Sequence, residues 1–78
     1  SRSILLRAAH AAPLPEVPEG VALRSSHDGV HEYAVDNWDV ASAWRTRLES
    51  VGANVLEVRE ERPSLEDYFV SRVGHKVT

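Results

Sequence analysis

The histidines are the residues of this sequence whose type and spacing come closest to a metal site. His27 and His31 lie four positions apart, and on a helix that spacing would bring both imidazoles to one side. Here, however, Asp28-Gly29 stands between them and is typical of a tight hairpin turn. In the register that this turn sets, the two side chains point to opposite faces, so they cannot chelate one ion. We therefore interpret them as surface histidines and predict no metal site.

Two pairs of carboxylates are candidates for acid–base catalysis, which requires such groups in a cleft with different environments. Glu60-Glu61 ends a predicted strand, and Glu66-Asp67 lies in the first turn of a predicted helix. These positions are typical of solvated charges and of partners for the helix dipole. The glycines are isolated rather than gathered in a phosphate-binding loop, and no serine stands in a nucleophile motif. The sequence therefore predicts no catalytic residue and no cofactor-binding residue.

Arg24 and Tyr33, on neighbouring strands of the predicted hairpin, are the one fragment of a base-stacking surface. The aromatic-glycine signature of RNA-recognition domains is missing, and the net charge of -3 has the wrong sign for binding phosphates. A cation–π contact between the two side chains across the hairpin is the favoured interpretation. We predict no nucleic-acid partner.

The composition is that of a small folded domain. The 78 residues are 42% hydrophobic and 27% charged, which excludes a disordered acidic tail and a basic arm. The sequence has no cysteine, so no disulfide or thiolate site supports the core, and a cytoplasmic location is expected. The apolar runs are too short to span a membrane.

The predicted elements follow the order strand, loop, strand, strand, helix, strand, helix. The strands are expected at about 3–10, 21–26, 30–35 and 53–59, and the helices at about 38–51 and 65–73. Pro13, Pro15 and Pro18 predict a loop where a crossover helix would otherwise lie. Residues 1–78 are therefore interpreted as a single α+β domain. The predicted fold is a ferredoxin-like four-stranded antiparallel sheet with a degraded first helix, one packed helix and an extra C-terminal helix.

The alternation of apolar residues predicts which face of each strand is buried. In the hairpin, Leu23 is expected opposite Ala34, and Arg24 opposite Tyr33. The predicted core face then holds Val21, Leu23, Val30 and Ala34. In the last strand, the inward residues are expected to be Leu56 and Val58.

The helix at about 38–51 has an amphipathic pattern. Its apolar stripe consists of Val40, Ala43, Trp44, Leu48 and Val51. Asp36 or Asn37 is expected to cap its start, and Gly52 to end it. Trp44 is therefore predicted in the core, whereas Trp38 either staples the entering strand or stands partly exposed.

The helix at about 65–73 carries an apolar side formed by Leu65, Tyr68, Phe69 and Val73. Such a side is too apolar to face water, so the helix either packs on its own sheet or docks on a partner. For packing in its own domain, the outer sheet face would offer Leu5, Ala9, Tyr33, Val35 and Val55.

The stretch Arg62-Pro63-Ser64-Leu65-Glu66-Asp67-Tyr68-Phe69-Val70, followed by Val73-Gly74, resembles the end of the ATP-binding subunits of bacterial ABC exporters. In that class, which includes antibiotic-resistance and multidrug exporters, a Pro-Ser-Leu-Glu-Asp-x-Phe stretch and a closing glycine are common. Pro18-Glu19-Gly20-Val21, the Asp28-Gly29 hairpin and the helix before Gly52 are similar to the same layout. Tyr68 departs from the pattern, which usually has a small or β-branched apolar residue there. The resemblance covers essentially all 78 residues.

This resemblance implies a non-catalytic C-terminal accessory domain that regulates or assembles a transporter for drug or antibiotic export. The sequence holds no Walker A, Walker B or ABC signature, so ATP and Mg²⁺ are expected only in an upstream domain of a parent ATPase chain. The implied partners are that nucleotide-binding domain, a second copy of the subunit and, indirectly, the membrane permease at the cytoplasmic face. The implied docking residues are Ser64, Leu65, Glu66, Asp67, Tyr68, Phe69 and Val73.

A small-molecule-sensing ferredoxin-like regulatory module is the alternative, since such sheets often pair and bind metabolites between them. That function would require a glycine-bearing ligand loop after the first strand, where this sequence has Ala11-Ala12-Pro13.

Overall fold

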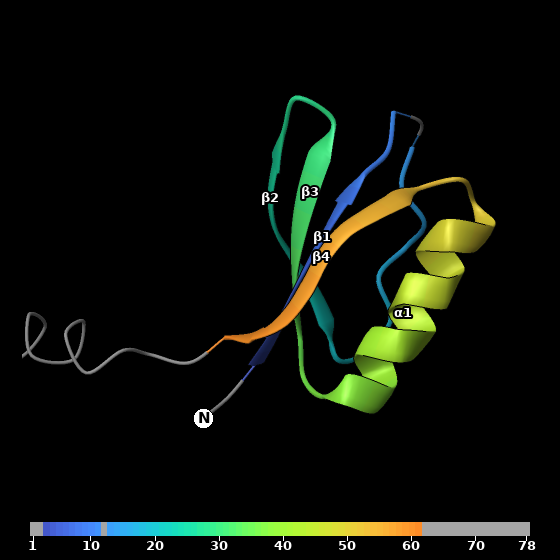
Figure 1. Cartoon of the computed structure of the whole chain (residues 1–78). Helices are drawn as coiled ribbons and strands as arrows, with labels where there is room; N and C mark the ends of the chain where they lie inside the picture. Colours follow the sequence, from blue (N-terminus) through green and yellow to red (C-terminus); the bar gives the residue numbers. More distant parts are fainter. Residues whose placement is uncertain (1–2, 12, 62–78) are drawn as a thin grey trace, which may run out of the picture.

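The computed structural model of the chain describes residues 3–11 and 13–61. It contains four strands and one helix, shown in Figure 1: β1 (Ser3–Ala9), β2 (Val21–His27), β3 (Val30–Val35), α1 (Trp38–Ser50) and β4 (Asn54–Glu61). The predicted helix at about 65–73 lies outside the described residues. Within the described ranges, no helix is both long and apolar enough to cross a membrane.

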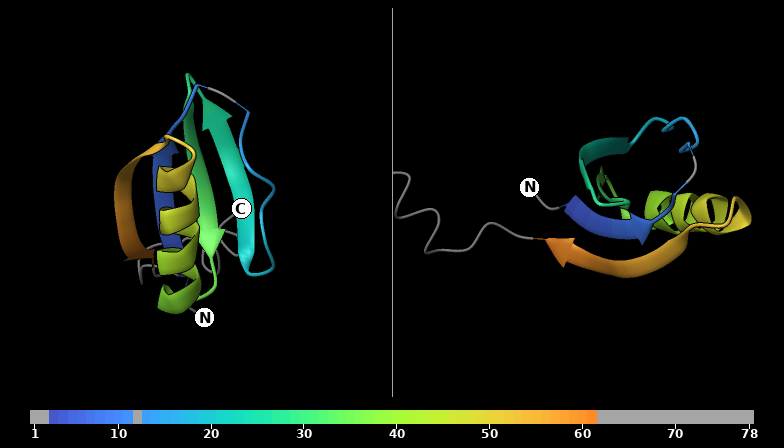
Figure 2. Two further views of the ribbon diagram at one scale, coloured as in Figure 1. Left: turned by 90° about the vertical axis from the view of Figure 1, so that its right-hand side faces the viewer. Right: turned by 90° about the horizontal axis from the view of Figure 1, so that it is seen from above.

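The strands form one antiparallel sheet in the order β2-β3-β1-β4. The connection from β3 through α1 to β4 passes over β1, so α1 covers one face of the sheet (Figure 2). No helix of the described ranges covers the other face, which we call the open face. The chain is therefore a small α+β domain with a four-stranded sheet and one packed helix.

The turn between β2 and β3 confirms the predicted hairpin. Asp28 has φ 53° and Gly29 has φ 77°, and a two-residue type I′ turn requires positive φ at both positions. His27 pairs with Val30 on either side of this turn, as the sequence predicts.

The ends of α1 also follow from the sequence. Of the two candidate caps, Asn37 is the one that acts, since its side-chain oxygen accepts a 2.9 Å hydrogen bond from the amide of Val40. Gly52 follows the helix with φ 92°, a conformation that a residue with a Cβ rarely adopts.

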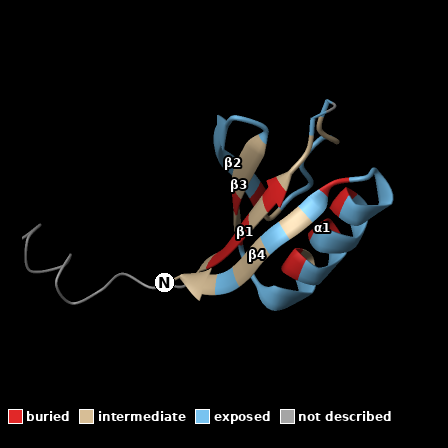
Figure 3. Cartoon of the chain, turned by 45° about the horizontal axis from the view of Figure 1, so that its top comes forward, coloured by how far each residue is buried: buried red, intermediate tan, exposed pale blue. Residues whose placement is uncertain are grey.

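The core lies between α1 and the sheet (Figure 3). Trp44 is only 2% exposed, which confirms its predicted burial, and its ring meets Tyr33 edge to face with centroids 5.3 Å apart. Trp38 is 51% exposed, so of the two alternatives for this residue, the partly exposed one holds. The buried residues of the cluster are Ile4, Leu6, Ala8, Val21, Tyr33, Val35, Ala41, Trp44, Leu48 and Ala53.

The predicted apolar stripe of α1 is wrong at two positions. Ala43 is exposed, and Val51 is 37% exposed beyond the last helical residue. Ala41 is buried instead, because the helix turns its Ala41, Trp44 and Leu48 side toward the sheet.

The predicted core face of the hairpin is right for Val21, which is buried, and wrong for Val30 and Ala34, which do not belong to the core. An irregularity in β2 is the reason. The register shifts between Leu23 and Ser25, so Leu23 pairs with Tyr33 rather than with Ala34. Tyr33 is fully buried under α1, whereas Leu23 is 48% exposed at the sheet edge. A bulge adds one residue to one strand and breaks its alternation, so strict alternation from the turn assigns the residues of β3 to the wrong faces.

A second irregularity, between β1 and β4, has the same effect. Leu6 pairs with Val58 and Ala8 with Val55, so these two valines lie three positions apart yet both pack against the core. The prediction is right for Val58 and wrong for Leu56, which is 47% exposed.

Residues 13–20 form no helix, as the prolines predict. The segment runs back toward the start of β2 (Figure 1) and is fixed at its end, where the amide of Asp36 donates to the carbonyl of Gly20 at 2.9 Å. Gly20 has φ 90°, and a Cβ there would stand 3.4 Å from Val40 of α1. We call residues 13–20 the strap, an irregular segment that lies beside α1.

Candidate functional site

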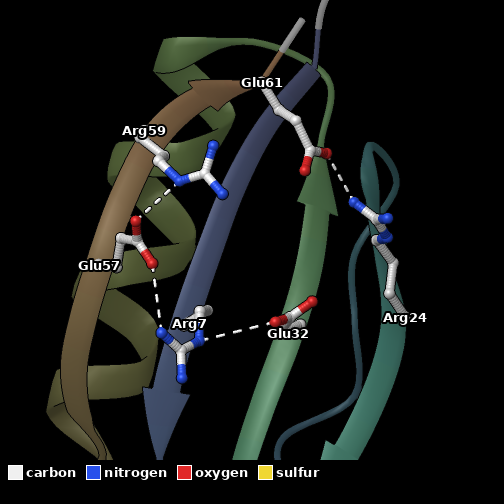
Figure 4. A network of polar contacts seen from close by, with 6 residues as sticks. All are labelled: Arg7, Arg24, Glu32, Glu57, Arg59 and Glu61. Carbon is white, nitrogen blue, oxygen red and sulfur yellow. Dashed lines mark hydrogen bonds and ion pairs between the residues drawn. The ribbon is translucent and has the colours of Figure 1, made fainter. Parts of the chain in front are cut away.

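The open face carries a network of ion pairs (Figure 4). Arg7 of β1 is the Cα partner of Glu32 on β3 and of Glu57 on β4. Its guanidinium lies 3.6 Å from the Glu32 carboxylate and 3.3 Å from that of Glu57, and Arg59 reaches Glu57 at 2.7 Å. The register of the sheet thus places opposite charges beside one another across three strands.

The pKa of Glu57 is lowered below its ordinary value by its hydrogen bonds to Arg59 and Arg7. This carboxylate is therefore fully ionised near neutral pH and is poorly suited to hold or deliver a proton in acid–base catalysis. All members of the network are partly exposed, so each pair adds little stability by itself.

Arg24 also belongs to the open face, where its Nη1 donates to Glu61 at 2.7 Å (Figure 4). The predicted cation–π contact with Tyr33 is therefore wrong, since Tyr33 lies beneath α1 on the other side of the sheet. Arg24 lies on β2 and Glu61 on β4, and these are the two edge strands of the sheet.

The same face was expected to offer an apolar surface for a C-terminal helix, and that expectation is wrong for three of its residues. Tyr33 and Val35 are buried under α1, and Val55 packs against the same core. Leu5, whose Cα partners are Ala34 and Arg59, is already 3% exposed without belonging to the core under α1. Its burial indicates that neighbouring side chains, including long charged ones, cover the apolar centre of this face.

Each histidine of the described ranges has its own polar contacts. His31 shares a 2.7 Å hydrogen bond with the Ser26 hydroxyl and a 3.2 Å one with the His10 carbonyl. His27 contacts Asp28 at 3.2 Å and is exposed, and its register position faces away from that of His31, as predicted. In residues 3–11 and 13–61, no three potential ligands gather into a metal-binding group.

A groove on the other side of the sheet lies between the strap and α1, with a volume of about 480 Å³. Its apolar wall is formed by Pro18, Val40, Ala43 and Trp44. Its charged residues are Glu16, Glu19, Asp39 and Arg47. We call this the strap groove; it lies within the size range of ligand and peptide sites.

The residues of the predicted docking set, Ser64, Leu65, Glu66, Asp67, Tyr68, Phe69 and Val73, lie outside the described residues. The sequence reasoning missed the open-face network and the strap groove. The alternation of Glu57, Arg59 and Glu61 along one strand is the signal that could have indicated a charged sheet face. The groove had no such signal, because it depends on how closely the proline-rich segment approaches α1.

Comparisons with known proteins add no relative: no family model matches the chain, and neither the curated proteins nor the solved structures contain a match.

Proposed function

We propose that the chain is the C-terminal accessory domain of an ABC exporter ATP-binding subunit, with a non-catalytic role in assembly or regulation of drug or antibiotic export. The observation that carries this proposal is the Arg62–Phe69 motif, which follows directly after the last strand of a four-stranded α+β sheet. Within the proposal, a further helix over about 65–73 supplies the docking residues.

The strand order supports the finer fold assignment within this proposal. The order β2-β3-β1-β4, with every neighbouring pair antiparallel, is the order of a ferredoxin-like sheet. In this assignment, the irregular strap over 13–20 stands for the first crossover helix. The proposed domain is thus a ferredoxin-like unit whose first helix is replaced by an irregular segment.

In this proposal, ATP and Mg²⁺ bind only to an upstream nucleotide-binding domain of the parent chain. This domain contacts that unit or its copy in the second subunit, and through them the permease at the cytoplasmic side of the membrane. The ionised, arginine-paired Glu57 is consistent with a role in contact rather than in chemistry.

The proposal is tested on the parent subunit with Phe69→Ala and with deletion of residues 64–78. Both changes are expected to weaken subunit dimerisation, measured by sedimentation at several concentrations, and export measured in cells, and to leave nucleotide affinity unchanged. Lys76→Ala, outside the motif, is the matched control. Unchanged dimerisation and export in the deletion variant would contradict the proposal.

A further inference from the structure

The strap groove is an opening in the layer that covers the sheet. A helix is about 10 Å across with its side chains, whereas residues 13–18 form an irregular segment with three prolines and no helix. This thinner segment lies against α1 near Gly20 and leaves the flank of α1 at Val40, Ala43 and Trp44 open to a groove. An apolar groove is therefore open beside α1, where the covering segment is irregular rather than helical.

The charges around the groove have one prevailing sign. The carboxylates of Glu16, Glu19 and Asp39 line it together with one guanidinium, that of Arg47. None of these three carboxylates forms an ion pair with another residue of the described ranges. The open face differs, because its carboxylates Glu32, Glu57 and Glu61 each contact an arginine.

Trp44 adds a second observation. This residue lines the groove although only 2% of its surface is exposed. Its indole Nε1–H is buried and has no acceptor among the described residues. This donor is shielded from the groove as well, so what the groove offers a partner is its apolar wall and its acids.

We propose that the strap groove is the docking site of a basic amphipathic segment of a partner polypeptide. An apolar side chain of this segment packs on Val40, Ala43 and Trp44, and an adjacent lysine or arginine pairs with the acids. An uncharged apolar segment would desolvate those carboxylates without compensation, and an acidic one would be repelled. The charge of the rim thus selects a basic partner. The inference rests on the described residues and does not depend on the proposed function.

The test uses the full chain and a defined probe, a twelve-residue amphipathic peptide of leucine and lysine. In an NMR titration, we expect shift changes at residues 39–47 and 16–19 of the chain and saturable binding that weakens with salt. A peptide with glutamate in place of lysine is the probe control and is expected not to bind.

Variants of the chain locate the binding site. Glu16→Gln with Glu19→Gln should weaken binding about tenfold, and Ala43→Arg, at an exposed helix position, should abolish binding by filling the groove with a cation. Glu32→Gln on the open face removes one charge outside the groove, so it should leave affinity unchanged. Circular dichroism of each variant verifies its fold.

Two results would overturn this inference. In the first, Glu16→Gln with Glu19→Gln weakens binding no more than Glu32→Gln does, and Ala43→Arg binds the peptide as tightly as the parent. This result would show unspecific charge attraction. The other is binding only after removal of residues 62–78, which would show that the chain's own end is the occupant. Neither result bears on the dimerisation and export test of the Phe69 variants, so the two proposals fail separately.

Discussion

At the scale of single residues, Tyr33 and Trp44 place two polar atoms in the core. Neither the Tyr33 hydroxyl nor the Trp44 Nε1 has a hydrogen-bond partner among the described residues. Helical spacing was sufficient to predict the burial of Trp44, since α1 is a regular helix. The burial of Tyr33 could not be predicted from alternation, because the bulge in β2 decides which residues share its face.

Removal of the Tyr33 hydroxyl is expected to be tolerated. Tyr33→Phe keeps the ring against Trp44 and removes a buried group that costs desolvation without a bond in return. The free energy of unfolding at pH 7 should stay within about 1 kcal/mol of the parent value or rise by that amount. Urea unfolding followed by circular dichroism measures it, and a larger loss would reveal a partner for the hydroxyl.

The burial of Tyr33 predicts that the domain loses stability at alkaline pH. Burial raises the pKa of Tyr33 above its ordinary value of 10.0, so the folded state holds the phenol proton more tightly than the unfolded state. This contribution is complete below about pH 10 and is lost as the pH rises through the raised pKa. The urea midpoint should therefore fall less steeply above pH 10 in Tyr33→Phe than in the parent. Parallel declines would contradict the assignment.

The two tryptophans offer a matched comparison. Trp44→Ala empties the centre of the core and should cost about 3 to 5 kcal/mol, enough to unfold a domain of this size. Trp38→Ala acts at a half-exposed ring and should cost about 1 kcal/mol or less. Thermal unfolding by circular dichroism compares them; similar costs would contradict the placement of Trp44 in the core.

At the scale of elements, regular pieces were predictable and irregular ones were not. The hairpin turn, the span of α1 and its end at Gly52 depend on local signals such as Asp28-Gly29, which act wherever they occur. The inward faces of β2 and β4 depend instead on bulges near Arg24 and Leu56, which nothing in the alternation marks. One extra residue in each strand brought Tyr33 and Val55 to the core side and left Leu56 exposed. Leu23 pairs with Tyr33, and it is exposed because β2 is an edge strand.

The cap of α1 predicts that substitutions at Asn37 and at Asp36 differ in their effect on the free energy of unfolding. Asn37→Ala removes the acceptor for the Val40 amide and should lower the free energy of unfolding by about 1 kcal/mol. Asp36→Ala leaves the backbone bond to Gly20 in place and should change it by about 0.5 kcal/mol or less. Urea unfolding of both variants is the measurement. A larger cost at Asp36 than at Asn37 would show that the other candidate is the true cap.

At the scale of the whole molecule, the two sides of the domain have different characters. On the open face, arginines pair with the glutamates of that face. In the strap groove, three carboxylates without an ion pair to the described residues lie beside an apolar wall. This difference could not be predicted from the sequence, because it arises from cross-strand register on one side and from the path of residues 13–20 on the other.

The central claim, that this domain belongs to an exporter ATP-binding subunit, is tested most directly by sequencing the coding region immediately upstream of Ser1. The proposed function predicts, in the same reading frame, a nucleotide-binding domain with a Walker A loop, an ABC signature and a Walker B strand in that order. An upstream region that encodes a different kind of domain, without these motifs, would contradict it.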